Sequence, residues 1–411
     1  MITDNNKHSW CVNAHHMMSV GTDGATKMCC MINHDYNYMT GSTGYTVGNR
    51  SLQDNFNNPA AVEIRQALDA GHRHPACANC WREEDAGRSS KRIRDNQIVA
   101  AEPNLYTGLA KLELNLGNIC NIKCKTCAPS VSSQWIPEAY YQTTLTKQNR
   151  YNSLRDFSTD YKKYSQSFDD ASPFWQDLEQ HLPNIREFNF YGGEPFLSRR
   201  MWDILRKAVD LGVAPLMELH YNTNGTLWPQ EVELWKHFKS VNLSFSIDGT
   251  GAQFESMRYL ARWPTVVKHM DQANELRAQG GLKNLGWCVT ISTLNIYYLP
   301  EIINEFLQNY HDRNFGLYLN LVHYAPRWCI AYLPQKVKQK VYDKLNQYDY
   351  SQYYWHNEYR AVIDFMMNGQ ENPQNWQDFL RQVNLQNQFR NENYQEIFPD
   401  YWRIISEYEQ Q

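Results

Sequence analysis

No stretch of the sequence approaches the roughly 20 consecutive apolar residues that a membrane-spanning helix needs. The opening residues, MITDNNKHSWCVNAHH, also lack the apolar segment of a secretory signal. Basic side chains are not in excess, since the formal net charge is −4, and a broad nucleic-acid-binding surface therefore has no support. No Ser/His/Asp arrangement and no phosphate-binding glycine-rich loop stands out. These absences predict a soluble, cytoplasmic protein whose partner is neither a membrane nor a nucleic acid.

Cysteine, by contrast, is plentiful and unevenly placed. Eight of the ten cysteines precede residue 128, and the other two, Cys288 and Cys329, stand in apolar, strand-like surroundings. Without a secretory signal, closely spaced cysteines favour metal or cluster ligation over disulfides. We therefore interpret the early cysteines as candidate ligands, and Cys288 and Cys329 as buried structural residues.

The 411 residues, 42% of them hydrophobic, allow a large packed core. Strand-like and helix-like patterns alternate after residue 110, which predicts an α/β fold with parallel β/α units, best described as a partial (β/α)6 barrel. The predicted strands are 112–116, 187–191, 217–221, 241–247, 287–292 and 316–322, and the predicted helices include 60–70, 201–211, 231–238 and 266–279. We expect an irregular, cysteine-dependent domain at 1–105, the barrel at 106–330 with an insertion at about 137–180, and a helical extension at 331–411.

Three cysteines follow the first predicted strand directly, as Cys120, Cys124 and Cys127 with C-x3-C-x2-C spacing. Thiolates are the preferred ligands of iron–sulfur clusters, and three of them can hold one face of a cubane cluster while one iron stays open. The alternatives are a zinc knuckle, or a cluster with a remote fourth ligand. The C-terminal end of a barrel strand is where the active sites of such barrels lie.

Further polar motifs follow the next strands. Two glycines in Tyr191-Gly-Gly-Glu-Pro195 allow a close backbone approach, and the Glu194 carboxylate can accept hydrogen bonds from an ammonium group. After the fourth strand, Ser246-Ile-Asp-Gly249 is followed by Arg258, whose guanidinium fork suits a carboxylate partner. Each motif alone also fits an ordinary turn or a surface salt bridge.

Taken together, these motifs resemble the radical S-adenosylmethionine (SAM) superfamily over residues 110–325. The resemblance implies that SAM occupies the open iron of a [4Fe–4S] cluster on Cys120, Cys124 and Cys127. It also implies that reductive cleavage of SAM gives a 5′-deoxyadenosyl radical that abstracts hydrogen from a substrate. The residues that the resemblance assigns to SAM are Gly192, Gly193, Glu194, Pro195, Asn224, Ser246, Arg258 and Asn295. The family usually places an aromatic residue before the last cysteine, where this chain has Thr126, so the adenine contacts are left unassigned.

The N-terminal cysteines form a second group. Cys11 and Cys29 have C-x12-G-x4-C spacing, which resembles the first half of the SPASM or twitch auxiliary-cluster motif, and Cys77 and Cys80 supply a CxxC. The resemblance implies four thiolate ligands for a second [4Fe–4S] cluster, with Cys30 as a possible replacement for Cys29. A structural zinc site would use the same residues. The order departs from the family, in which such domains follow the barrel.

The resemblance further implies an oxidoreductase-type enzyme that oxidises or cross-links a peptide or protein side chain and takes electrons from a flavodoxin- or ferredoxin-type reductant. A small-molecule or nucleoside substrate is the alternative within the family. Outside enzymes, both cysteine groups would suit a structural zinc protein or an iron–sulfur electron-transfer protein. His220, His323 and Tyr324 fall in or just after predicted strands, where they face a substrate or complete the core and rim.

Overall fold

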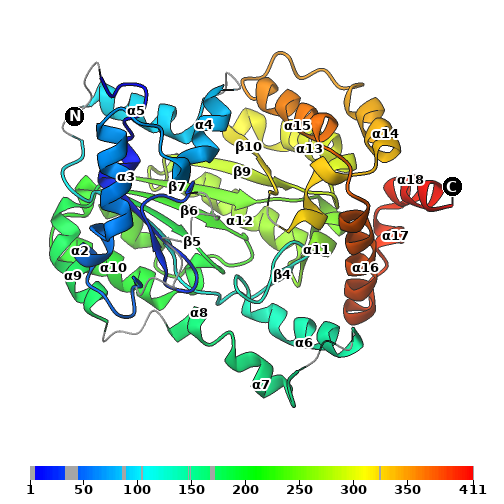
Figure 1. Cartoon of the computed structure of the whole chain (residues 1–411), viewed down its shortest axis with the longest axis horizontal. Helices are drawn as coiled ribbons and strands as arrows, with labels where there is room; N and C mark the ends of the chain where they lie inside the picture. Colours follow the sequence, from blue (N-terminus) through cyan, green and yellow to red (C-terminus); the bar gives the residue numbers. More distant parts are fainter. Residues whose placement is uncertain are drawn as a thin grey trace. The chain divides into compact units, whose positions relative to one another are not determined.

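The computed structural model describes residues 5–32, 45–85, 89–102, 105–146, 148, 150–166, 172–323 and 325–410. Its central feature is an eight-stranded sheet with the strand order β10–β9–β7–β6–β5–β3–β1–β2 (Figure 1). The pairs β1–β3, β3–β5, β5–β6 and β9–β10 are parallel, whereas β2 is antiparallel to β1. The strands are β1 (Met17–Val20), β2 (Thr26–Lys27), β3 (Lys111–Asn115), β5 (Glu187–Tyr191), β6 (Glu218–Thr223), β7 (Ser240–Ser246), β9 (Asn284–Ile291) and β10 (Phe315–Leu321).

The six predicted barrel strands are all present, and the predicted α/β fold with a helical C-terminal region is confirmed. The expectation of an irregular N-terminal segment was wrong in one respect, because β1 and β2 extend the sheet beyond those six strands. β1 pairs with β3 in the register Ser19 to Glu113, so this part of the chain contributes directly to the sheet.

The chain divides into two compact units by its internal contacts. The first comprises Met1–Ile119, Ser158–Tyr221 and Pro229–Asn242, and the second comprises Cys120–Phe157, Asn222–Trp228 and Leu243–Gln411. Helices of the first unit are α1 (Val12–His16), α2 (Leu52–Phe56), α3 (Pro59–Asp69), α4 (Ala78–Asp85), α5 (Lys91–Ala101), α8 (Lys163–Gln166), α9 (Pro173–His181) and α10 (Arg199–Asp210). Those of the second are α6 (Ile136–Leu145), α11 (Gly251–Met257), α12 (Trp263–Ala278), α13 (Leu299–Asn309), α14 (Gln335–Leu345), α15 (His356–Asn368), α16 (Pro373–Arg390), α17 (Tyr394–Ile397) and α18 (Pro399–Glu409). The short helix α7 (Leu154–Thr159) lies where the two units join along the chain.

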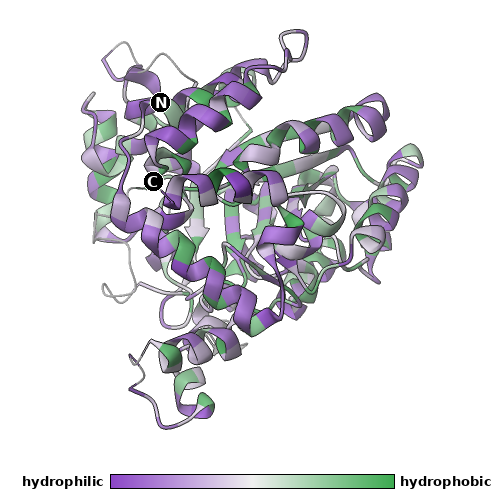
Figure 2. Cartoon of the chain, turned by 90° about the vertical axis from the view of Figure 1, so that its right-hand side faces the viewer, coloured by the Kyte–Doolittle hydropathy of each residue, from purple (hydrophilic) through white to green (hydrophobic). Residues whose placement is uncertain are grey.

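In strands β6 and β7, buried and partly exposed side chains alternate, as the two-residue period of a strand predicts, whereas all four residues of β1 are buried. In β7, Val241, Leu243 and Phe245 are buried, while Ser244 and Ser246 are partly exposed. Helices show the matching pattern, with purple and green turns alternating along their length in Figure 2. One face of β6 and of β7 therefore belongs to the core, and the other face carries partly exposed polar side chains.

Each unit has its own aromatic core. In the first unit, Phe190, Phe196 and Trp235 all pack against the ring of Tyr221, with ring centroids 5.3–5.5 Å apart. In the second, Trp287 contacts the rings of Phe306 and Tyr310 at 5.5 and 4.7 Å. None of the helices in the described part of the chain is both long enough and apolar enough to cross a membrane.

Candidate active site

The three-cysteine loop lies in the second unit and is fastened by a two-residue strand. Strand β4 (Lys123–Cys124) pairs antiparallel with β8 (Arg258–Tyr259), so that Cys124 lies opposite Arg258. The indole nitrogen of Trp135 donates to the carbonyl oxygen of Cys124 at 2.8 Å. Cys120 and Cys124 are buried, and Cys127 is half-buried. The fold therefore fixes the middle cysteine through its backbone and leaves the third one partly open.

Arg258 brings positive charge to the cysteine loop. Its Nη1 donates to the sulfur of Cys124 at 3.6 Å, and its Nη2 forms an ion pair with Asp248 at 2.9 Å. The remaining guanidinium nitrogen, Nε, is buried without a hydrogen-bond partner among the described residues. Both Arg258 and Asp248 are buried, so the charge interaction is only weakly screened. The arrangement leaves one donor of Arg258 available to a further acceptor.

The pKa values of the thiols reflect this environment. A hydrogen bond from Cys127 lowers the pKa of Cys124, and the nearby Arg258 lowers it further against the effect of burial. The pKa of Cys127 is raised, because its proton is shared with Cys124 and because it is buried. Cysteine binds iron as the thiolate, and a lower pKa of the Cys124 thiol makes that form easier to reach.

Cys120 is held by an amide network in the second unit. The side-chain nitrogen of Asn224 donates to the Cys120 sulfur at 3.8 Å and to the side-chain oxygen of Asn121 at 2.9 Å. Asn121 in turn donates to the hydroxyl of Thr226 at 2.7 Å, and that hydroxyl donates to Asn224 at 2.6 Å. The predicted residue Asn224 therefore contacts the cysteine loop itself, which is a structural role in addition to the predicted contact with SAM.

Two further predicted SAM residues lie at the ends of β7 and β9. Ser246 is the last residue of β7 and is partly exposed. Asn295 is buried, and its amide nitrogen donates to the carbonyl oxygens of Asp248 and Thr290 at 2.9 and 3.0 Å. Asn295 therefore ties the loop after β9 to the loop that carries Asp248, and a contact of either residue with SAM stays a prediction.

The glycine-rich turn belongs to the first unit. Gly193 donates through its backbone to Gly117 at 3.0 Å, and Glu194 donates to Ile119 at 2.8 Å. A Cβ atom on Gly193 would lie 2.1 Å from the Ile119 oxygen, and Gly192 has a φ of +114°. These glycines thus allow the turn to approach the segment that leads into Cys120. The contact of Gly192 and Gly193 with SAM, which the resemblance implies, stays a prediction.

The other two residues of this motif form a short helical turn. The Glu194 carboxylate accepts from the backbone nitrogen of Phe196 at 3.3 Å, and the buried Pro195 begins the 3-10 helix η6 (Pro195–Leu197). Glu194 is itself buried. Its predicted contact with the SAM ammonium group stays a prediction.

All four predicted auxiliary cysteines come together in the first unit. Cys11, Cys29, Cys77 and Cys80 line one cavity, whose wall also includes Arg92. Burial raises the pKa of Cys11 to about 12, and burial together with the charges of Cys11 and Cys80 raises that of Cys77. No group of three or more His, Cys, Asp or Glu side chains in the described ranges is arranged to hold a single metal ion. Two buried thiols, Cys29 and Cys80, and two half-buried ones, Cys11 and Cys77, would repel one another as thiolates, and the cationic core of a cluster would stabilise them.

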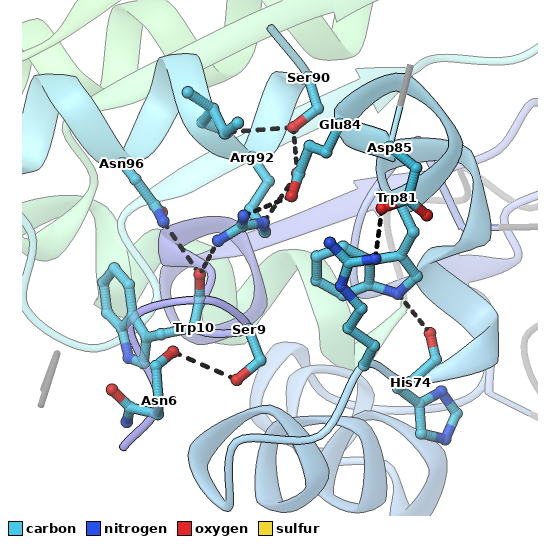
Figure 3. A network of polar contacts seen from close by, with 12 residues as sticks. Asn6, Ser9, Trp10, His74, Trp81, Glu84, Asp85, Ser90, Arg92 and Asn96 are labelled. Atoms are coloured by element: carbon cyan, nitrogen blue, oxygen red, sulfur yellow. Dashed lines mark hydrogen bonds and ion pairs between the residues drawn. The ribbon is translucent and has the colours of Figure 1, made fainter. Parts of the chain in front are cut away.

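Arg92, which lines the same cavity as these cysteines, carries a permanent positive charge, and Figure 3 shows its contacts with Glu84 and Trp10. Its Nε and Nη2 bind both oxygens of Glu84 at 2.9 and 2.6 Å, and its Nη1 donates to the carbonyl oxygen of Trp10 at 2.9 Å. The guanidinium lies 5.0 Å from the ring of Trp81, the residue after Cys80. Arg92 lowers the pKa of Cys80, both through its backbone hydrogen bond and through its charge, although burial raises that pKa overall.

The structure distinguishes Cys29 from Cys30. Cys29 is buried and lines the cavity, whereas Cys30 is exposed and is not part of the cavity wall. The geometry therefore favours Cys29 as the ligand.

The remaining polar candidates pack as ring neighbours. His220 is partly buried, with its ring centroid 6.2 Å from that of Tyr191. His323 contacts the ring of Phe365 at 5.2 Å. Tyr324 lies outside the described residues.

Several residues of the site were not predicted from the sequence. Asp248 lies in the Ser246-Ile-Asp-Gly249 motif. A carboxylate at that position, ahead of Arg258, could have indicated an ion pair between the two residues. Asn121 lay within the cysteine motif, but an intervening residue of such a loop carries no signal of its own. Arg92 and Glu84 follow the CxxC closely, yet the pattern gave no reason to single them out.

The sequence was compared with known protein families, curated proteins and solved structures. Residues 114–311 match the family model described as the Radical SAM superfamily. No curated protein sequence matches the chain.

The solved structures that the chain was found to resemble share little sequence with it. They include anSMEcpe with bound AdoMet, which has 15% identity and a TM-score of 0.33, with 64% of this chain and 62% of that chain covered. Streptococcus suis SuiB has 12% identity and a TM-score of 0.36, with 76% and 63% covered. The chain thus spans about three fifths of the length of these two structures. Over residues 114–311, the chain is therefore similar to the radical SAM superfamily.

Proposed function

We propose that the chain is a radical SAM enzyme in which Cys120, Cys124 and Cys127 hold the SAM-cleaving cluster. The observation that carries this proposal is the pairing of β4 with β8, which sets Arg258 against the sulfur of Cys124. It joins two motifs that are 134 residues apart in the chain. When bound, the cluster and SAM supply a carbon radical that abstracts hydrogen from positions that acid–base chemistry cannot reach.

The residues of the chain would then have distinct tasks. Asp248 orients Arg258, and the free Nε of Arg258 suits the carboxylate of SAM. Asn224 fixes Cys120, and the Gly192–Pro195 turn supports the segment before it. Ser246 and Asn295 complete the proposed SAM-binding set at the ends of their strands.

We infer that Cys11, Cys29, Cys77 and Cys80 hold a second [4Fe–4S] cluster. Support comes from the shared cavity and from the cation of Arg92 at its wall. Four protein ligands leave no iron open, which suits electron transfer rather than SAM cleavage. An electron acceptor favours an oxidation as the overall reaction, with a flavodoxin- or ferredoxin-type protein as the reductant for SAM cleavage.

The proposed substrate is a peptide or protein side chain, which is oxidised or cross-linked. This choice follows from the resemblance of the N-terminal cysteine spacing to the SPASM and twitch motifs. A small molecule or a nucleoside is the second candidate, because no dedicated peptide-binding domain was recognised in the sequence. The alternative to an enzyme is a non-catalytic protein in which both groups of cysteines bind structural zinc.

The decisive test is anaerobic reconstitution followed by metal analysis and a SAM-cleavage assay. We expect about eight irons per chain, four for each cluster, and 5′-deoxyadenosine formation with dithionite as the reductant. Cys124→Ala should abolish 5′-deoxyadenosine, whereas Cys329→Ala, which removes another buried thiol of the same unit, should retain it. Bound zinc without any SAM cleavage would exclude the proposed enzyme.

A further inference from the structure

The C-terminal extension contacts the cysteine loop through a buried arginine. Arg390 is the last residue of α16, and its Nε donates to both carboxylate oxygens of Glu138 at 3.1 and 3.0 Å. Glu138 also binds the Nζ of Lys123 at 3.0 Å, and Lys123 is the residue before Cys124. The side chains of Arg390 and Glu138 are fully buried. A single carboxylate therefore joins the C-terminal helix to the strand that carries the middle cysteine.

The guanidinium of Arg390 lies between two aromatic rings of the same loop system. Its Cζ is 5.0 Å from the ring centroid of Trp135 and 5.0 Å from that of Tyr259. Trp135 donates to the carbonyl oxygen of Cys124, and Tyr259 follows Arg258 in β8. Arg390 thus contacts the neighbours of both members of the Cys124–Arg258 pair.

A second set of contacts reaches the other side of Cys124. Gln386 in α16 donates to the backbone oxygen of Lys125 at 3.0 Å, and the buried Nζ of Lys125 binds Glu392 at 2.9 Å. Figure 1 shows α16 in dark red beside β4, in agreement with these contacts. Residues 386–392 lie outside the 114–311 segment that matches the family model.

These buried charges do not cancel. Lys123, Lys125 and Arg390 are cations, whereas Glu138 and Glu392 are the two carboxylates that they contact. Both Nη atoms of Arg390 are buried without a hydrogen-bond partner in the described part of the chain. In a region of low dielectric constant, such a surplus cation acts over several ångströms. Net charge near an iron–sulfur cluster is one of the factors that set its reduction potential.

We propose that Arg390 is a positioning residue for the cluster on Cys120, Cys124 and Cys127, and that its charge raises the reduction potential of that cluster. The inference rests on the proposed function, because it requires a cluster at these cysteines. Reduction adds one negative charge to the cluster, and a fixed buried cation stabilises the reduced form more than the oxidised one. The C-terminal extension is then part of the machinery that makes reductive SAM cleavage accessible to a cellular reductant.

The test is a redox titration of the reconstituted full-length protein. The reduced cluster on Cys120, Cys124 and Cys127 is monitored by EPR and is identified as the cluster whose signal changes when SAM is added. Arg390→Met keeps an apolar stem between the two rings and removes the charge. We expect a roughly tenfold shift of the reduction equilibrium toward the oxidised cluster, which corresponds to about 59 mV. Arg390→Lys should restore the wild-type midpoint, because it keeps the cation. Arg381→Met, which removes an exposed arginine from the same helix, serves as the matched control.

The outcomes separate this inference from the proposed function. A wild-type protein without any SAM-responsive cluster overturns both. A SAM-responsive cluster with equal midpoints in wild type and Arg390→Met overturns the role of Arg390 alone, and so does an equal shift in Arg390→Lys. If Arg390→Met does not fold, Arg390→Gln provides the same test, because it also removes the charge while its side-chain amide can still donate to Glu138. An unchanged midpoint in that variant also overturns the inference.

Discussion

Gly193 has only a hydrogen atom where other residues have a side chain, and the carbonyl oxygen of Ile119 lies directly against that position. An added methyl group would meet that oxygen at 2.1 Å, so backbone on one side must move. We expect Gly193→Ala to lower the free energy of unfolding by about 1–3 kcal/mol, as overpacking does in cores. It should also lower iron retention, because Ile119 precedes Cys120.

Thermal unfolding and iron content after reconstitution measure these two effects. Gly48→Ala is the control in the same unit, because its Cβ would have its nearest neighbour at 3.7 Å. If Gly193→Ala matched this control in both measurements, the close approach of Gly193 to the backbone of Ile119 would contribute nothing to stability or to iron retention.

Cys29 and Cys30 are adjacent in the chain and differ in burial. Cys29 lines the four-cysteine cavity and Cys30 does not, so only the first should be a ligand. We expect Cys29→Ala to lose about four irons, one cluster's worth, and still to form 5′-deoxyadenosine. Cys77→Ala should behave in the same way.

Cys30→Ala is the matched control and should keep the full iron content. The assignment of Cys29 would have to be reversed if Cys30→Ala lost the four irons and Cys29→Ala kept them. Retention of all iron in Cys77→Ala would remove the basis for a four-ligand cluster. Both counts come from the same iron analysis.

Among the secondary-structure elements, α5 is joined to α1 and β3 by charge. Asp95 of α5 binds Lys91 at 3.2 Å, Lys111 of β3 at 3.8 Å, and the side-chain nitrogen of Asn13 in α1 at 2.8 Å. Burial acts to raise the pKa of Asp95, but the two lysines and the Asn13 hydrogen bond lower it overall. Its stabilising contribution is therefore present above the unfolded-state pKa of about 3.9 and is lost as the pH falls through the lower folded-state pKa.

We expect Asp95→Asn to reduce the free energy of unfolding at pH 7 by about 1–3 kcal/mol, the usual cost of losing a hydrogen bond to a charged group. The difference from wild type should shrink below pH 4. Urea unfolding at pH 7 and below pH 4 measures this difference in the free energy of unfolding. Asp378→Asn is the control, because the ion-pair partner of Asp378, Arg381, is exposed. An equal difference at both pH values would show that the charge of Asp95 does not cause the effect.

Predictability from the sequence varied among the elements. The six barrel strands were predicted to within a few residues, because apolar runs with a two-residue period identify them. The segment 231–238 was predicted as a helix and is the 3-10 helix η8 (Val232–His237). Only Val232, Leu234 and Trp235 are apolar within its six residues, so the sequence is too short and too weakly periodic to separate a 3-10 helix from an α-helix. Strand β1 was missed because all four of its residues are buried, so no alternation marks it.

For the molecule as a whole, local spacing predicted the candidate ligands but not their surroundings. Cys120, Cys124 and Cys127 were predicted from their close spacing, whereas Cys11, Cys29, Cys77 and Cys80 were predicted from the resemblance of their spacing to the SPASM or twitch motif. The contact of Arg390 with Glu138 joins residues 252 positions apart, and that of Gln386 with Lys125 joins residues 261 positions apart. No motif encodes such contacts, because they arise only when the C-terminal extension packs.

The position of β1 in the sheet also has a consequence for the order of folding. Cys11, Cys29, Cys77 and Cys80 all precede Lys111–Asn115, the strand with which β1 pairs. A ribosome that adds about 5–20 residues per second delivers all four thiols before that partner strand exists. The ladder between β1 and β3 therefore closes only after the whole cysteine-bearing segment has been synthesised. Until then, the nascent chain must keep four reactive sulfurs reduced and apart without the help of the sheet.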